Sequence, residues 1–177
     1  KEQKNNLFGH IFIKNDKKPI IIAEIKPKSP SEGILYKKDL IQLAKIYENN
    51  GADAISVLTD SKYFGGSIDL LKKIRQKTKL PILRKDFIIS KAQILETFQA
   101  GANAVLLIVS ILPPTKLKQL ITLANSLNII PLVEIYDKKE LEIALQADAK
   151  FIGVNARNLK TLEINQEKAL QVLKAIP

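Results

Sequence analysis

Charged side chains stand at the ends of several apolar segments in this sequence. Lys85 ends the segment Pro-Ile-Leu-Arg-Lys, and Glu134 ends Ile-Ile-Pro-Leu-Val-Glu. Glu24 and Lys26 lie two residues apart at the end of another segment, so their side chains point to the same side of an extended strand. A carboxylate and an ammonium that face each other can exchange a proton. The pattern therefore predicts acid–base chemistry, with a structural salt bridge as the alternative.

Further polar residues follow the same rule. Asn155 and Arg157 end another apolar segment, where Asn155 can orient a hydroxyl or carbonyl and Arg157 can bind a carboxylate through two hydrogen bonds. Ser29 belongs to a Lys-Ser-Pro loop suited to an anionic group, although an ordinary turn would look the same. Thr59 and Ser110 also end apolar segments. The alternative for Arg157 is a surface arginine.

Four apolar residues sit just beyond these segment ends or within them, and they predict a pocket for an aromatic ring. They are Phe64, Phe87, Leu106 and Leu159. Packing in the core is the usual role of a single aromatic residue. Placement next to the polar tips makes substrate binding the sharper hypothesis.

The elements that would position these residues repeat along the chain. Gly51-Ala-Asp-Ala, Gly101-Ala-Asn-Ala and Ala147-Asp-Ala each end a helical pattern and begin an apolar one, as expected for a left-handed turn after a helix. Capping boxes are predicted at Ser90/Gln93 and Asp137/Glu140, and further N-caps at Ser67 and Asn165. The predicted strands are 19–24, 53–58, 81–85, 103–109, 130–134 and 151–155, and the predicted helices are 37–49, 67–77, 91–100, 115–127, 138–146 and 165–175.

Alternation of strand and helix predicts an α/β fold with a parallel sheet that carries its chemistry at one rim. Six units are present, which leaves two alternatives. The chain forms an open six-stranded sheet, or it is a (β/α)8 TIM barrel truncated to its first six units. We expect one catalytic domain over 19–177, preceded by 1–18 as the remnant of an N-terminal extension.

Composition excludes several classes of function. The chain has no Cys and a single histidine, His10, which we expect at the surface, so thiolate chemistry and a His-rich metal site are excluded. A net charge of +10 is spread over scattered lysines rather than concentrated in a basic block, which favours a solvated surface over nucleic-acid binding. No apolar run is long enough to predict a membrane span, and a cytoplasmic protein is expected. Met is absent, even at position 1, which indicates a fragment.

Five motifs together resemble the indole-3-glycerol phosphate synthase family. They are Ile22-Ala-Glu-Ile-Lys-Pro-Lys-Ser-Pro-Ser31, Ser56-Val-Leu-Thr-Asp-Ser-Lys-Tyr-Phe-Gly-Gly-Ser67, Leu83-Arg-Lys-Asp-Phe-Ile-Ile-Ser90, Pro131-Leu-Val-Glu134 and Ile152-Gly-Val-Asn-Ala-Arg-Asn-Leu159. Their order and spacing match the family from about residue 19 to the end of the chain.

The resemblance implies a lyase of tryptophan biosynthesis that works without cofactor or metal. It would convert 1-(2-carboxyphenylamino)-1-deoxyribulose 5-phosphate to indole-3-glycerol phosphate, with release of carbon dioxide and water. Lys85 would be the general acid, with Glu134 and Lys26 as proton-transfer partners. Glu24 and Asn155 would orient the lysines and the sugar hydroxyls. Ser29 and Arg157 would lie near the substrate carboxylate, and Phe64, Phe87, Leu106 and Leu159 would form the pocket for the anthranilate ring.

The resemblance also defines what is missing and what competes. Only a short remnant of the family's N-terminal helical extension over the barrel mouth precedes the first strand. The family's seventh strand with Glu-Ser-Gly and its eighth with a Gly-Ser phosphate grip have no counterpart here. The main alternative is therefore an inactive fragment or half-barrel that only binds phosphorylated anions. Phosphoribosylanthranilate isomerase is a weaker alternative because its family uses a Cys/Asp pair. Fusion to, or association with, other tryptophan-pathway enzymes is left open, and neither nucleic acid nor a membrane is an expected partner.

Overall fold

The structure is a computed structural model that describes residues 6–13, 19–30, 33–35, 39–159 and 161–177. Six strands form one parallel sheet in the spatial order β1-β4-β5-β6-β7-β8. Their bounds are β1 Ile22–Ile25, β4 Ala54–Leu58, β5 Ile82–Lys85, β6 Ala104–Ile108, β7 Ile130–Ile135 and β8 Phe151–Val154. Each spatial neighbour beyond β1 is also the next of these strands along the chain, as repeated right-handed βα units require.

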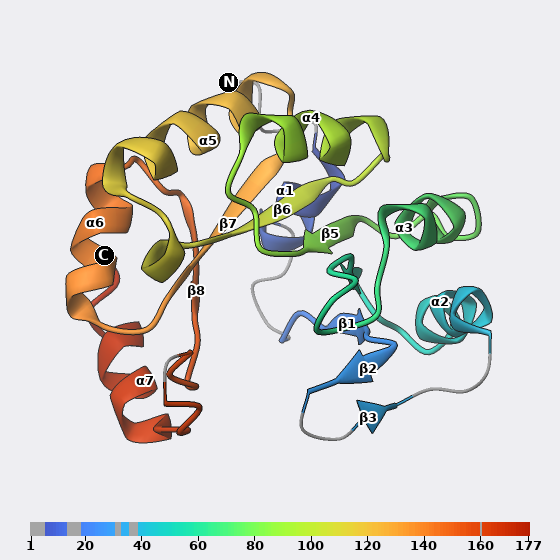
Figure 1. Cartoon of the computed structure of the whole chain (residues 1–177), viewed down its shortest axis with the longest axis horizontal. Helices are drawn as coiled ribbons and strands as arrows, with labels where there is room; N and C mark the ends of the chain where they lie inside the picture. The colour runs from blue at the N-terminus through green and yellow to red at the C-terminus, as the bar shows by residue number, and fades with distance from the viewer. Residues whose placement is uncertain (1–5, 14–18, 31–32, 36–38, 160) are drawn as a thin grey trace.

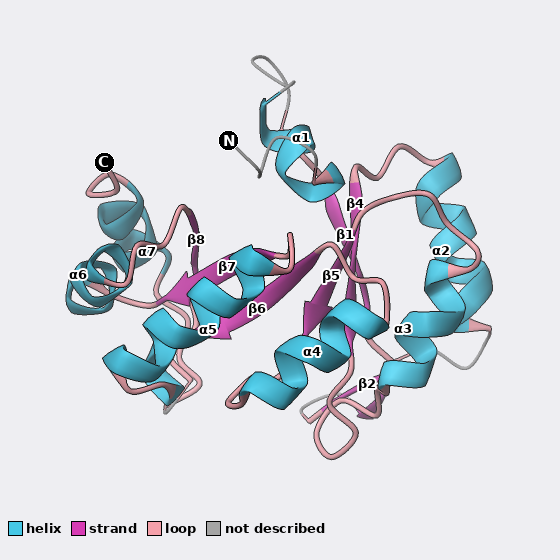
Figure 2. Ribbon diagram, turned by 90° about the horizontal axis from the view of Figure 1, so that it is seen from above, coloured by secondary structure: helices cyan, strands magenta, loops and turns pink. Residues whose placement is uncertain are grey.

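One helix follows each strand of the sheet. The bounds are α2 Leu40–Asn49, α3 Ile68–Arg75, α4 Lys91–Gln99, α5 Pro114–Ser126, α6 Lys138–Gln146 and α7 Gln166–Leu173. Figure 2 shows these helices along one side of the curved sheet. The fold is therefore α/β, a parallel half-barrel of six βα units with β1 and β8 at its two edges. Within the described ranges, no helix has both the length and the apolar character needed to cross a membrane.

All six predicted strands and all six predicted helices are present, with bounds shifted by three residues at most. The predicted helix start at 37 lies outside the described residues. Short elements were not predicted, because two to seven residues carry too little periodicity to recognise. These are α1 Leu7–Ile13, the antiparallel pair β2 Lys28–Ser29 and β3 Gly33–Ile34, and a 3-10 turn, η2, at Val109–Ile111 (Figure 1).

Four joints between a helix and the next strand share one conformation. The residue after the helix cap has a positive φ, of 88° at Gly51, 78° at Gly101, 57° at Asn128 and 66° at Asp148. At Gly101, the next amide, that of Ala102, donates to the carbonyl of Thr97, and the other three joints repeat this bond. This is the Schellman arrangement, which satisfies carbonyls at a helix end. The predicted repeat is confirmed, and it extends to Asn128.

Helix starts follow the predicted caps with one exception. Ser90 and Gln93 form a full capping box, while Ser67 and Asn165 cap α3 and α7. Asp137 accepts from the amide of Glu140, as predicted. The carboxylate of Glu140 reaches past Asp137 to the amide of Tyr136, at 2.8 Å, so the second half of this box is displaced by one residue.

Helix α1 closes the end of the sheet where the strands begin. Phe8 is fully buried against the first inward-facing residues of the strands, including Ala54, Ala104 and Ile130. Asn6 donates to the carbonyls of Asn103 and Asn128 in the turns that precede β6 and β7. The range 1–18 was predicted as the remnant of an extension, and its described part therefore packs at the end opposite the strand tips. His10, expected at the surface, is half-buried on this helix.

Candidate active site

Alternation along the strands decides which side chains face the hollow of the half-barrel. Ile22 and Leu83 pack around Phe8 on the inner side, whereas Ile25 and Val57 pack towards α2 and α3 on the outer side. Side chains two residues further along a strand share its face. Glu24 and Lys85 therefore lie on the inner side, at the C-terminal tips of β1 and β5, and the same alternation places Glu134 there.

Glu24 binds both lysines of the predicted site. Lys85 Nζ donates to Glu24 Oε2 at 2.7 Å, and Lys26 Nζ lies 3.6 Å from Glu24 Oε1. The three side chains are 31%, 32% and 37% exposed for Glu24, Lys26 and Lys85. Among the carboxylates at the strand tips, it is Glu24 that pairs with Lys85. Both lysine side chains thus lie beside one carboxylate and remain about one third exposed.

Glu134 and Asn155 form a second group, on β7 and just after β8. Asn155 Nδ2 donates to Glu134 Oε1 at 3.0 Å, and Asn155 Oδ1 accepts from the backbone amide of Arg157 at 2.9 Å. The carboxamide therefore fixes the carboxylate and also shapes the turn that carries Arg157. Asn155 acts here on Glu134, and the two residues were predicted to lie in one site.

A cleft of about 240 Å³ opens beside this second group. It contains the predicted residues Glu134, Asn155, Arg157 and Leu159, and it also contains Ser110. Its remaining lining residues include Tyr136, Asp137, Glu140 and Lys168. Burial raises the pKa of the Glu140 carboxyl, and the negative charges of Asp137 and Glu134 raise it further, against the amide hydrogen bond from Tyr136.

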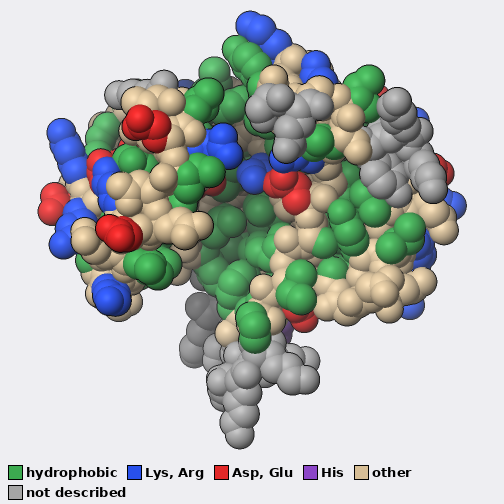
Figure 3. Space-filling model, turned by 90° about the horizontal axis from the view of Figure 1, so that it is seen from below, with side chains coloured by type: hydrophobic (Ala, Val, Ile, Leu, Met, Phe, Trp, Pro, Cys, Tyr) green, Lys and Arg blue, Asp and Glu red, His purple; other side chains and the backbone are tan. Residues whose placement is uncertain are grey.

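The predicted ring pocket is found in separate parts. Phe64 and Phe87, on the loops after β4 and β5, lie with ring centroids 6.3 Å apart, and Tyr63 stacks edge-on to Phe87 at 6.0 Å. Leu106 is buried in β6, and Leu159 lies in the cleft beside Arg157. Figure 3 shows hydrophobic side chains lining the hollow, with basic and acidic side chains along its rim. Tyr63 was not predicted as part of this group.

Ser29 is buried in β2, on the loop that leaves β1. The preceding residue ties this loop to the one after β4, because the Lys28 amide donates to the Phe64 carbonyl at 3.1 Å and Lys28 Nζ donates to the Lys62 carbonyl at 3.0 Å. The position of Ser29 is thus linked to that of Phe64. Ser31, which ends the first motif, lies outside the described residues.

The structure places two polar residues, Thr59 and Ser56, in surroundings that the sequence did not reveal. Thr59 was grouped with the rim residues, but it is buried on the outer side and bonded to Arg84 and Asp86, so its role is structural. Ser56 faces inward beside Glu24 in the register, and its buried hydroxyl has no hydrogen-bond partner among the described residues. Ser56 could have been recognised from the sequence, because it is the polar residue within the otherwise apolar strand β4.

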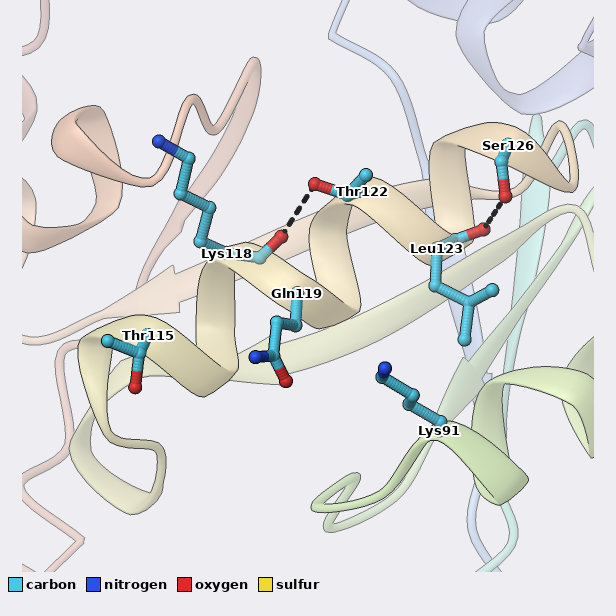
Figure 4. Close-up of a pocket in the computed structure, with 7 residues that line it drawn as sticks. All are labelled: Lys91, Thr115, Lys118, Gln119, Thr122, Leu123 and Ser126. Atoms are coloured by element: carbon cyan, nitrogen blue, oxygen red, sulfur yellow. Dashed lines mark hydrogen bonds between the residues drawn. The ribbon is translucent and has the colours of Figure 1, made fainter.

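Two further observations concern where the site lies and whether it could hold a metal. A larger depression, of about 530 Å³, lies on the outer surface between α4 and α5 (Figure 4). It contains none of the predicted site residues, and its hydroxyls of Thr122 and Ser126 donate to carbonyls of their own helix. Among the described residues, no cluster of His, Asp and Glu has the arrangement of a metal site.

Parallel strands with helices on their outer side and charged residues at their C-terminal tips define the class of (β/α)-barrel proteins. Solved structures agree. The fold is similar to thiamine phosphate pyrophosphorylase from Pyrococcus furiosus, with a TM-score of 0.60, 16% identity and coverage of 79% of this chain and 66% of that one. It is also similar to N-acetylmannosamine-6-phosphate 2-epimerase from Clostridium perfringens, with a TM-score of 0.59, 13% identity and coverage of 86% and 72%. At these identities the likeness concerns the fold alone.

Sequence comparison narrows the class to one family. The family model described as indole-3-glycerol phosphate synthase matches residues 1–177. Proteins of that name are 47% identical in Aquifex aeolicus, 48% in Leptospira interrogans and 49% in Staphylococcus aureus, over 88%, 89% and 92% of this chain. The chain belongs to the indole-3-glycerol phosphate synthase family. It spans 61%, 63% and 62% of the length of these three relatives.

Proposed function

We propose that the protein containing this chain is an indole-3-glycerol phosphate synthase of tryptophan biosynthesis. It closes the indole ring of 1-(2-carboxyphenylamino)-1-deoxyribulose 5-phosphate and releases carbon dioxide and water. The observation that carries the proposal is the Lys85–Glu24–Lys26 group at the tips of β1 and β5, in a chain of this family. The proposal requires no cofactor.

Ring closure needs an acid at the substrate ketone. In the proposed reaction the aromatic carbon that bears the carboxylate attacks the ketone carbon, and Lys85 protonates the carbonyl oxygen as the bond forms. The hydrogen bond from Lys85 to Glu24 supports this role, because it fixes the direction of the ammonium. Loss of carbon dioxide then returns its bonding electrons to the ring and restores aromaticity.

Dehydration completes the indole. A proton leaves the substrate as the hydroxyl departs with another proton, so the step requires one base and one acid. Glu134 is the proposed base, oriented by Asn155, and Lys26 is the proposed partner in proton transfer. Arg157 and Ser29 are proposed to bind the substrate carboxylate. Phe64, Phe87, Leu106 and Leu159 are proposed to enclose the ring, for which the stacked pair of Phe64 and Phe87 gives support.

The test is turnover by the full-length protein. Purified protein is mixed with the carboxyphenylamino substrate, and the indole product is followed by its fluorescence and identified by mass. Formation of product together with one equivalent of carbon dioxide is expected. A folded full-length protein that binds the substrate and releases neither product would refute the proposed function.

A second candidate concerns the 177-residue chain by itself, which would bind phosphorylated anions without turnover. It is favoured by the open sheet edges at β1 and β8 and by coverage of only 61–63% of the relatives. The same assay on this chain alone, with calorimetric titration of a phosphate analogue, distinguishes the two candidates. Binding without product supports the second candidate, and product formation excludes it.

A further inference from the structure

Arg84 lies on the outer side of β5, directly before Lys85, and uses all five of its hydrogen-bond donors. Only 3% of Arg84 is exposed. Its Nε donates to Thr59 Oγ1 at 3.0 Å; Nη1 donates to Gln93 O at 3.0 Å and Thr97 Oγ1 at 3.2 Å; Nη2 contacts Asp86 Oδ2 at 3.0 Å and Glu96 Oε2 at 2.7 Å. A buried guanidinium needs this full set of partners, because each missing partner costs free energy.

The acceptors belong to three segments around the tip of β5. Thr59 follows β4, Asp86 begins the turn after β5, and the other three lie on α4. The two threonines extend the hydrogen-bond network, since Thr59 donates to Asp86 and Thr97 donates to the Gln93 carbonyl. Arg84 is therefore the centre of a network that joins two strands and one helix.

The same network fixes the backbone on both sides of Lys85. The Lys85 carbonyl accepts from the Thr59 amide at 3.0 Å. Asp86 Oδ1 accepts from the Phe87 amide at 2.8 Å, and Gln93 Nε2 donates to the Phe87 carbonyl at 3.0 Å. Residues 85–87 are thus held by groups that Arg84 itself orients.

Arg75 provides a natural comparison at the other end of the same strand. This half-buried arginine donates to the carbonyls of Leu80 and Thr78, just before β5 begins, and to Asn103 Oδ1. Burial lowers the pKa of its guanidinium, against the nearby charge of Glu48. The two arginines therefore anchor opposite ends of β5, but only Arg84 is next to the proposed general acid.

We propose that Arg84 is a positioning residue, which sets the location of Lys85 and Phe87 from the far side of the strand. This inference rests on the proposed function for the role of Lys85. A displacement of a reacting group by about 1 Å costs up to roughly 100-fold in rate, so a looser strand tip lowers turnover even when the fold persists. Arg84 touches neither the hollow nor Lys85 Nζ in this role, and it acts only through the backbone and Asp86.

The experiment compares Arg84→Met with Arg75→Met in the full-length protein. Each substitution removes a guanidinium that is hydrogen-bonded at one end of β5, Arg84 from within the strand and Arg75 from the end of α3, so both should lower Tm. Arg84→Met should lower kcat by about 10- to 100-fold and raise KM, because Phe87 is displaced together with Lys85, while Arg75→Met should leave both kcat and KM unchanged. Arg84→Lys keeps the charge with fewer donors, so it should retain more stability and an intermediate kcat, which keeps the test open if Arg84→Met does not fold.

A second measurement separates this inference from the proposed function. Hydrogen exchange of the amides of residues 86–89, and acetylation of Lys85 followed by peptide mass spectrometry, report the strand tip without turnover. Both should be faster in Arg84→Met and unchanged in Arg75→Met. If the unsubstituted protein has no synthase activity but this difference persists, the proposed function is wrong and the positioning role stands. Unchanged exchange and acetylation in Arg84→Met, or equal loss of kcat in both variants, would overturn the positioning role.

Discussion

The two ends of the six-stranded sheet are made of different kinds of side chain. Where the strands begin, Phe8 is fully buried and Asn6 donates to two carbonyls. Where the strands end, Glu24, Lys26 and Lys85 remain about one third exposed around a shared carboxylate. The first end is closed and its polar groups are paired within the protein. The second end keeps charges accessible, so mutations there should affect the proposed chemistry, whereas mutations at the first end should affect stability.

The largest expected effect is on turnover. Lys85→Ala in the full-length protein should lower kcat by about 10²- to 10⁴-fold, the usual contribution of a positioned general acid. The free energy of unfolding should change little, because Lys85 is partly exposed and Glu24 retains Lys26 as a partner. Steady-state kinetics and urea denaturation measure the two quantities. Lys91→Ala, at an exposed lysine of α4, is the control and should leave kcat unchanged. A wild-type rate for Lys85→Ala would refute the role of Lys85.

The opposite result is expected where the strands begin. Phe8→Ala should lower the free energy of unfolding by about 3–5 kcal/mol, because it opens a cavity in a fully buried cluster. The kcat of the molecules that remain folded should not change. Phe12→Ala, at the exposed end of the same helix, should cost much less. Equal losses in the two variants would show that α1 does not close the sheet as described.

A glycine near the charged strand tips sharpens the comparison, because its role there is to allow close packing of the backbone. A Cβ on Gly66 would lie 2.0 Å from the Leu58 carbonyl oxygen, so Gly66→Ala must displace the backbone after β4. We expect a loss of about 1–3 kcal/mol, typical of overpacking, and a higher KM since Phe64 lies on the displaced loop. Gly153→Ala is the matched control, because its nearest neighbour would be 3.7 Å away. Urea denaturation that gives equal stability for both variants would contradict this expectation.

The smallest effect concerns pH. Because the pKa of Glu140 is raised in the folded protein, the folded protein binds the proton of this carboxyl more tightly than the unfolded chain does. The protonated carboxyl therefore adds to the stability of the fold. This stabilisation is fully present below the ordinary glutamate pKa and is lost as pH rises through the pKa of the folded protein. Glu140→Gln keeps an acceptor for the Tyr136 amide and removes the charge. Its stability relative to wild type should therefore rise with pH, by at most about 2–4 °C in Tm. Thermal melts from about pH 4 to 8 measure the difference, and a constant difference would contradict it.

Sequence patterns predicted the sheet and its rim well. The strands are apolar and the helix joints repeat, so both signals were strong. The shared face of Glu24 and Lys26 followed from the two-residue period of a strand. Their contact with Lys85 required the spatial order of β1, β4 and β5, which brings residues 61 positions apart in sequence within 2.7 Å.

The structural roles of Thr59 and Arg84 could not be predicted, for one physical reason. Thr59 and Arg84 follow or lie within apolar segments, as the site residues do, but their side chains point to the outer side of the sheet. Their role depends on which face of the strand they occupy and on what α4 offers there, namely Gln93, Glu96 and Thr97. Such a network links residues that are distant in the sequence, and each of them alone looks like an ordinary surface residue.

The four left-handed joints have a consequence for how such a chain can change over generations. Each joint is completed by carbonyls of its own helix, and it works with Gly, Asn or Asp at the same place. It therefore does not depend on which unit comes before or after it. A gene that recombines at a joint exchanges a whole strand and helix while the local bend is preserved. We therefore expect exchange of units to be tolerated best at Gly51, Gly101, Asn128 and Asp148, all at the end of the sheet away from the charged rim.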